Sequence, residues 1–268
     1  MRRPSPATVR RLILVLILVL WELVPRTGLL AELFLPSLSK TLTVLVQNWE
    51  EYAHALMVTL YEVALAMLIA CGGGILVGAL VGGLAILRNL LLPVFSSLYA
   101  VPIVILYPIF TAWFGIGSES KIAFAGIYGF FPVMLSTAAG IRTIEPQYVL
   151  AARSMGATLP QLIRRVIIPA SIPTVLTGLR LGGALTIIGV VVAEMLTSAA
   201  GIGYLVTRYR TILESAHVFA AILMILVLSV MFDVLARAVE RRMLVWQTAG
   251  RREKKSADVT AVPVPAPA

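Results

Sequence analysis

The sequence carries little charge for its length. Of its 268 residues, 13% are charged and 59% are hydrophobic, and the mean hydropathy is +0.95. A soluble domain usually has about 25% charged and 45–50% apolar residues. The low charge therefore excludes a water-soluble single domain, and the high apolar fraction excludes a disordered chain. We expect an integral membrane protein.

The sequence also lacks the residue groups that bind metals or nucleotides. Its one cysteine, Cys71, excludes an internal disulfide and a multi-cysteine metal site. Its two histidines, His54 and His217, stand apart and form no His-Glu-x-x-His motif. None of the lysines follows a glycine, as a phosphate-binding loop would require. We therefore expect no catalytic residue, no metal site and no cofactor in this chain, which is not expected to be an enzyme.

The apolar residues form runs that are long enough to cross a bilayer. A hydrocarbon core of about 30 Å needs roughly 20 apolar residues in a helix. Five runs satisfy this length, and a sixth at the N-terminus is shorter. We predict an all-α protein with about six transmembrane helices, at residues 12–24, 56–87, 90–114, 122–141, 175–196 and 218–236.

The N-terminal run could be a secretory signal, because arginines precede it. No small-residue cleavage site follows Trp21, so we expect a retained anchor. The chain then divides into an anchor with an external segment (1–55), a permeation core (56–240) with an internal loop (142–174), and a basic tail rich in proline and alanine (241–268).

The basic residues indicate the orientation. With the N-terminus inside, 17 of the 22 lysines and arginines lie on the cytoplasmic side, including Arg88 and Arg180. Cytoplasmic loops of membrane proteins carry such an excess, so both termini are expected in the cytoplasm. This asymmetry explains the net charge of +9. We therefore do not expect binding to nucleic acid.

Glycines within the runs are placed for helix contact. They recur at four-residue steps, a spacing that lets two helix backbones approach closely in lipid. We expect ordinary packing inside one bundle, with a seam between two copies as the alternative. The residues are Gly74, Gly78 and Gly82 in one run and Gly178 and Gly182 in another.

Ionisable residues within the runs are candidates for function because burying them in lipid is costly. Glu62 has no evident local partner, and we consider Glu62 and Glu194 for the translocation path. Glu194 and Arg180 bracket thirteen residues, about 20 Å of helix, so they could instead extend to opposite interfaces. Asp233 and Arg237 are spaced to pair on one helix face.

The internal loop predicts a helical elbow. Pro146 suits the first turn of a helix, and Gly156 suits a left-handed cap at its end. A second helix is expected over residues 159–168, ending before Pro169. A small face at Ala151 and Ala152 makes this shape suitable for docking into the cleft of another protein.

The same loop resembles the EAA loop of ABC-importer permeases, which reads Glu-Ala-Ala, three residues, Gly, nine residues, Ile-x-Leu-Pro. Leucine replaces the glutamate here, while both alanines, the glycine and the proline are kept. The flanking sequences Trp113-Phe114-Gly115-Ile116-Gly117 and Ala193-Glu194-Met195 are similar to the nitrate/sulfonate/taurine branch. The matching loop positions are Leu150, Ala151, Ala152, Gly156, Val166, Ile168 and Pro169.

The resemblance implies a type I ABC-importer permease in the plasma (inner) membrane. In that family two permease copies, expected here to be identical, form the pathway. Cytoplasmic ATPase subunits bind ATP and dock on the loop, and an external or periplasmic solute-binding protein delivers the substrate. Small anions or organic solutes of the nitrate/sulfonate/taurine type are the expected substrates. The alternative is a secondary carrier or channel without an ATPase partner, which would place charges nearer mid-membrane and lack a docking elbow.

Overall fold

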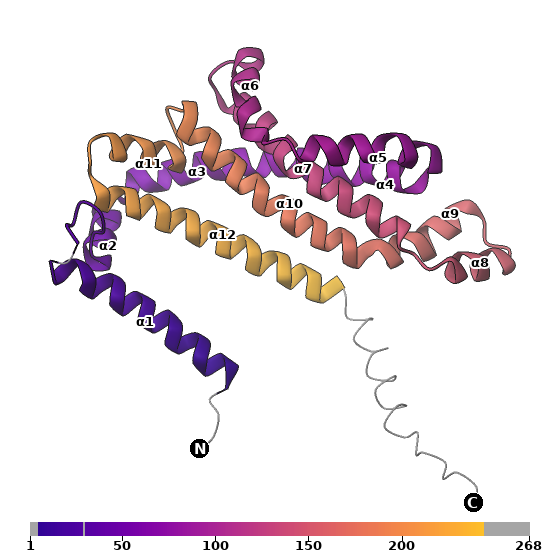
Figure 1. Ribbon diagram of the computed structural model, residues 1–268, viewed down its shortest axis with the longest axis horizontal. Coiled ribbons are helices and arrows are strands. Elements are labelled where there is room, and N and C mark those ends of the chain that lie inside the picture. The colour runs from indigo at the N-terminus through magenta and orange to yellow at the C-terminus, as the bar shows by residue number, and fades with distance from the viewer. Residues whose placement is uncertain (1–4, 29, 244–268) are drawn as a thin grey trace, which may run out of the picture.

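The computed structural model describes residues 5–28 and 30–243, and these residues form helices without any β-strand. The proline-rich end of the expected tail lies outside the described residues. In Figure 1, α7, α10 and α12 run along the long axis of the molecule. The elements are α1 (Pro6–Arg26), α2 (Leu38–Gln47), α3 (Trp49–Met67), η1 (Leu68–Gly73), α4 (Gly74–Gly83), α5 (Ala85–Tyr99), η2 (Ile103–Leu106), α6 (Tyr107–Phe114), α7 (Ser118–Arg142), α8 (Pro146–Ser154), α9 (Leu159–Leu162), η3 (Ile163–Ile167), α10 (Ile168–Thr197), α11 (Ile202–Thr211) and α12 (Ser215–Met243).

Four helical segments in the described part of the chain are long and apolar enough to cross a membrane. They are Trp49–Gly83, Ser118–Arg142, Leu159–Thr197 and Ser215–Met243. The helices α5 and α6 pass the same test only as a bent pair, which gives five spans when the pair is taken as one broken span. The helix α1 covers the first predicted run, but it carries charged residues at both ends and is not among these candidate spans.

The third predicted span, residues 90–114, is broken into two helices rather than formed by one continuous helix. The segments Ala85–Tyr99 and Ile103–Phe114 are bent by 86°. Pro102 has no N–H to continue the helix, and its ring disfavours the helical conformation at Val101. In Figure 1, α6 projects away from the bundle, whereas α5 lies along it.

The helix α7 lies at the centre of the bundle, in contact with α3, α4 and α10. The glycines at four-residue spacing permit these contacts. A Cβ atom added at Gly78 would lie 2.5 Å from the carbonyl oxygen of Met134, and one at Gly182 would lie 2.7 Å from that of Gly129. Both glycine seams are therefore contacts between helices of one chain.

Two π-helical turns interrupt otherwise regular helices. The turn η1 joins α3 to α4, so residues Trp49–Gly83 form one continuous segment. The turn η3 joins α9 to α10, so the internal loop continues into the span Leu159–Thr197 without a break. A movement at the loop end of this segment is thus applied directly to a membrane-spanning helix.

Candidate functional site

The internal loop folds as the predicted helical elbow, which we define as residues 146–167. Pro146 occupies the first turn of α8, and Gly156 follows the helix with φ +77°. The N–H of Gly156 donates to the carbonyl of Arg153 at 2.9 Å, and that of Ala157 donates to Ala152 at 3.1 Å. These bonds close the helix end around a left-handed residue, so the predicted glycine cap is confirmed.

The second half of the elbow differs from the prediction. Thr158 begins α9 in a capping box, in which its N–H donates to Gln161 at 2.9 Å. The helix was expected to end before Pro169, but it runs through this residue into α10. The π turn η3 lies directly before α10, and its wider backbone makes room for the proline ring, which would clash in a regular helix.

The helices α8 and α9 of the elbow lie beyond the end of the bundle (Figure 1), and several of their apolar residues are exposed. Leu150 and Met155 are 68% and 81% exposed, and Tyr148 and Leu159 are exposed as well. Between α8 and the start of α10 lies a hollow of about 570 Å³. Its lining includes Tyr148, Ala151, Ala152, Met155, Arg165, Val166, Pro169 and Ala170, so four of the seven predicted loop positions meet there, whereas Leu150, Gly156 and Ile168 do not line it.

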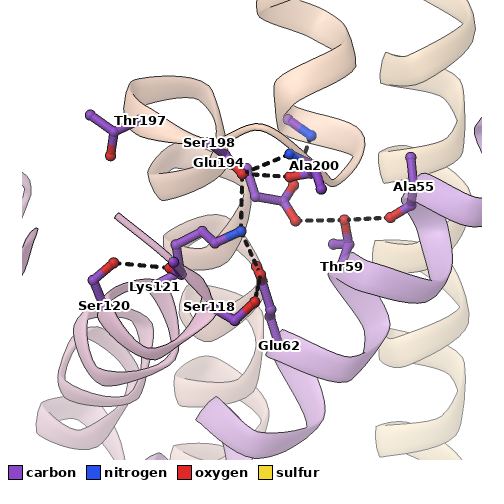
Figure 2. A network of polar contacts seen from close by, with 12 residues as sticks. Ala55, Thr59, Glu62, Ser118, Ser120, Lys121, Glu194, Thr197, Ser198 and Ala200 are labelled. Atoms are coloured by element: carbon purple, nitrogen blue, oxygen red, sulfur yellow. Dashed lines mark hydrogen bonds and ion pairs between the residues drawn. The ribbon is translucent and has the colours of Figure 1, made fainter. Parts of the chain in front are cut away.

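A cluster of polar side chains, buried or half-buried, connects α3, the start of α7 and the end of α10 (Figure 2). We call Thr59, Glu62, Ser118, Lys121, Glu194 and Ser198 the polar cluster.

The first half of this cluster surrounds Glu62. The Nζ of Lys121 lies 2.5 Å from Glu62 Oε1, and the Ser118 hydroxyl donates to the same oxygen at 2.7 Å. Glu62 Oε2 is buried and accepts no hydrogen bond from the described residues. Glu62 has no partner close to it in the sequence, but the fold supplies one, because α7 brings Lys121 to it.

The second half surrounds Glu194, which is also buried. Its Oε1 accepts from the Thr59 hydroxyl at 2.7 Å, and its Oε2 accepts from the N–H of Gly203 at 2.7 Å. The sequence allowed Glu194 to extend to a membrane interface, and the structure shows that it does not, because its side chain is buried. The chain turns tightly around this carboxylate, and Gly201 has φ +104°.

Lys121 joins the two halves of the polar cluster. Its Nζ also donates to the Ser198 hydroxyl at 3.0 Å, in the turn that follows Glu194. Lys121 is not among the candidate site residues that the sequence indicated. The signal in the sequence was the position of Lys121 directly before an apolar run. The structure buries Lys121 in the first turn of α7 instead of leaving it in solvent.

A second ionic group joins α10 to α12. Arg180 Nη2 lies 2.6 Å from Asp233 Oδ1, so Arg180 does not extend freely to an interface. Arg237 Nη2 lies 2.6 Å from Asp233 Oδ2, which confirms the predicted pairing on α12. In the described part of the chain, no three His, Cys, Asp or Glu residues lie close enough together to hold a metal ion.

Comparisons with known proteins agree with this arrangement. Residues 74–245 match the family model described as binding-protein-dependent transport system inner membrane component. The chain is 32% identical over 234 residues to SsuC of Bacillus subtilis, a permease protein named for aliphatic sulfonate transport, covering 86% of this chain and 84% of SsuC. It is 31% identical over 244 residues to the taurine transport permease protein TauC of Escherichia coli, covering 87% of each.

Solved structures show the same fold. The MetNI methionine ABC transporter in an inward-facing conformation matches with a TM-score of 0.63 at 17% identity, covering 73% of this chain and 97% of that one. An amino acid ABC transporter crystallised with histidines matches with a TM-score of 0.61 at 20% identity, covering 75% and 97%. The fold is therefore the all-helical permease fold of ABC importers. Together with the family match over most of its length, this places the chain in the family of binding-protein-dependent transport system inner membrane components, as a multi-pass protein of the inner membrane.

Proposed function

We propose that this chain, as one of two identical copies, forms the membrane pathway of an ATP-driven importer, and that its elbow docks into the ATPase. Permeases of this family work with ATPase subunits and a solute-binding protein. The elbow is the observation that supports the docking surface. It combines exposed apolar side chains with a hollow between α8 and the start of α10.

The continuity of the helix supports a coupling role for the elbow. The segment Leu159–Thr197 runs from the elbow to the turn after Glu194. Its 39 residues contain a π turn but no loop that would absorb a displacement. A push on the elbow by the ATPase would therefore move the helix that carries Glu194 of the polar cluster. This is how closure of an ATPase dimer would reach the far side of the membrane.

The replacement of the usual glutamate changes the expected contact with the ATPase. Leu150 is exposed and apolar, so it offers dispersion and hydrophobic contact in place of an ion pair. Tyr148 and Met155 are exposed on the same elbow. We infer that the matching cleft of the ATPase is lined by apolar residues rather than by a lysine or arginine aimed at this position.

The substrate class follows from the relatives. Two of them are named for aliphatic sulfonates and for taurine. We therefore propose that the importer carries small organic sulfonates. The solute-binding protein would select among them, and its pocket would contain cationic side chains for the sulfonate group.

Reconstitution tests this function. The chain would be placed in proteoliposomes with its partner ATPase and solute-binding protein, and uptake of labelled taurine and butanesulfonate would be measured. We expect uptake of at least one sulfonate that requires ATP and all three components. The purified chain alone should neither bind nor hydrolyse ATP. Uptake by the chain alone, without ATP, would instead establish the carrier or channel alternative.

A further inference from the structure

The span formed by α5 and α6 leaves part of its backbone without partners. After α5 ends, the chain turns through 86° before α6. The carbonyl oxygens of Tyr99, Ala100 and Val101 accept no hydrogen bond from any described residue. All three residues are exposed in the single chain. The break therefore presents three bare acceptor groups on its surface.

Two hydroxyl groups lie next to these carbonyls. Ser96 and Ser97 are exposed on the last turn of α5, and the structure gives neither hydroxyl a partner among the described residues. Several hydroxyls within the spans donate back to their own helix, as Thr137 does to Val133 at 2.7 Å and Thr186 does to Gly182 at 2.9 Å. The end of α5 is thus a polar patch, separated by apolar residues from Arg88 and Asn89 at the start of the helix.

This patch lies near the middle of the membrane. Arg88, at the start of α5, marks one membrane face, because a charged side chain is costly in the hydrocarbon core. Tyr99 is eleven residues further along the chain, which is about 16 Å of helix. A hydrocarbon core is about 30 Å thick. The unpartnered groups therefore lie roughly halfway across.

The patch is also held in place. The ring of Tyr99 stacks on that of Phe131 with a centroid distance of 6.1 Å, and Phe95 contacts Phe131 edge-on at 6.5 Å. These two rings fix the last turn of α5 against the central helix α7. The break is therefore a fixed feature of the fold rather than a frayed helix end.

Lipid tails cannot satisfy such groups, and each unsatisfied polar group in hydrocarbon costs several kcal/mol. Irregular backbone at this depth is tolerated only inside protein or beside water. We propose that residues 96–101 form a polar wall of the translocation path, in water between two permease copies. This inference rests on the proposed function, since it assumes that the chain forms a path for a polar solute.

The chemistry of the wall suits the proposed solutes. Serine hydroxyls can donate to sulfonate oxygens, and carbonyl oxygens can accept from an ammonium group. An aminoalkanesulfonate carries both groups. The wall would replace part of the water around such a solute as it passes the bend between α5 and α6.

Thiol accessibility tests the proposal in the assembled importer. Cys71 is the only cysteine, so Cys71→Ser provides a background without reactive thiols. Ser96→Cys and Ser97→Cys would be added separately and treated with the water-borne anionic reagent methanethiosulfonate ethylsulfonate. The reaction rate would be measured at rest and in the state trapped by ADP and vanadate. Leu76→Cys on α4 is the matched control, since Leu76 is 68% exposed and lies about 10 Å from its helix end at Gly83.

We expect at least one of the two serine positions to react ten or more times faster than position 76 in at least one of the two states. Rates equal to that of position 76 in both states would overturn the proposal, because the break would then be sealed in protein or lipid. Sulfonate uptake by the same proteoliposomes separates this failure from a failure of the proposed function. Uptake with unreactive serine positions contradicts only the polar wall, whereas reactive positions with ATP-independent uptake contradict only the ATP-driven role.

Discussion

Lys121 and Glu62 form an ion pair of 2.5 Å in which the two side chains are 4% and 0% exposed. They come from α7 and α3, so the pair connects two helices inside the bundle. Removing one partner of a buried pair leaves an uncompensated charge and costs about 3–5 kcal/mol, whereas apolar replacement of both partners is often neutral. The buried carboxylate of Glu194 nearby would make the loss of Lys121 still more costly.

The first prediction compares the loss of one partner of this ion pair with the apolar replacement of both partners. Lys121→Met should lower the thermal unfolding temperature of the detergent-purified chain strongly, because two buried carboxylates lose their cation. The double variant Glu62→Met with Lys121→Met should recover most of that loss. Thermal unfolding followed by thiol or tryptophan fluorescence measures both. A double variant that is less stable than Lys121→Met would show that the pair is not the relevant interaction.

The second prediction concerns the turn around Glu194. Gly201 has φ +104°, and a Cβ atom added there would overlap the Glu194 carboxylate. Gly115 has φ +79°, but nothing lies within 4 Å of an added Cβ. Both glycines have ψ near 180°, a conformation that costs other residues about 1–3 kcal/mol, so the difference between the two alanine variants isolates the clash.

We expect Gly201→Ala to reduce the yield of folded protein at least severalfold relative to Gly115→Ala. Size-exclusion chromatography after detergent extraction gives both yields. Equal yields would mean that the carboxylate moves aside without loss, and that the tight turn is not required.

The third prediction concerns pH. Tyr209 is buried and its hydroxyl donates to Glu51 Oε2 at 2.5 Å. Burial, followed by this carboxylate, raises the pKa of Tyr209 from 10.0 to about 12. Between these values the unfolded chain has lost the phenol proton while the folded chain keeps it, so stability falls as pH rises.

The contribution of Tyr209 is therefore complete below pH 10 and is lost progressively toward pH 12. Unfolding temperatures of the wild type and of Tyr209→Phe would be compared at pH 8 and pH 11. The wild type should lose more of its stability over this interval than the variant does. An identical loss in both proteins would show that Tyr209 does not titrate as described.

Local features were readable from the sequence. Periodic apolar runs predicted the long helices α7, α10 and α12, because bilayer thickness sets their length. The elbow was predictable because Pro146 and Gly156 act through local backbone rules: one begins a helix and the other ends it. The glycine spacing likewise indicated close helix contact, although it did not say with which helix.

Long-range features were not readable in the same way. The pairing of Lys121 with Glu62 depends on how α7 meets α3, and no local rule fixes that register. The continuation of the helix through Pro169 depends on the π turn η3, for which hydrophobic periodicity gives no warning. The bend at Pro102 is an intermediate case, since a proline interrupts a helix by a local rule, but that rule does not fix an 86° change of direction.

The central claim, that the elbow couples this permease to an ATPase, is tested most directly at Gly156. Its φ of +77° disfavours any side chain, although an added Cβ would meet nothing within 4 Å inside this chain. Gly28 is the matched control, with φ +74°, an equally open surrounding and a position outside the elbow. Gly140 would be unsuitable as a control, because a Cβ atom added there would lie 3.1 Å from the Cβ of Thr174.

The measurement is ATP hydrolysis stimulated by the loaded solute-binding protein, in proteoliposomes that contain the whole importer. Gly156→Val should insert normally into the membrane, co-purify poorly with the ATPase and lose the stimulated hydrolysis. Gly28→Val, which carries the same backbone strain of about 1–2 kcal/mol, should retain both. Wild-type stimulated hydrolysis and normal ATPase binding in Gly156→Val would contradict the claim that the elbow is the coupling element.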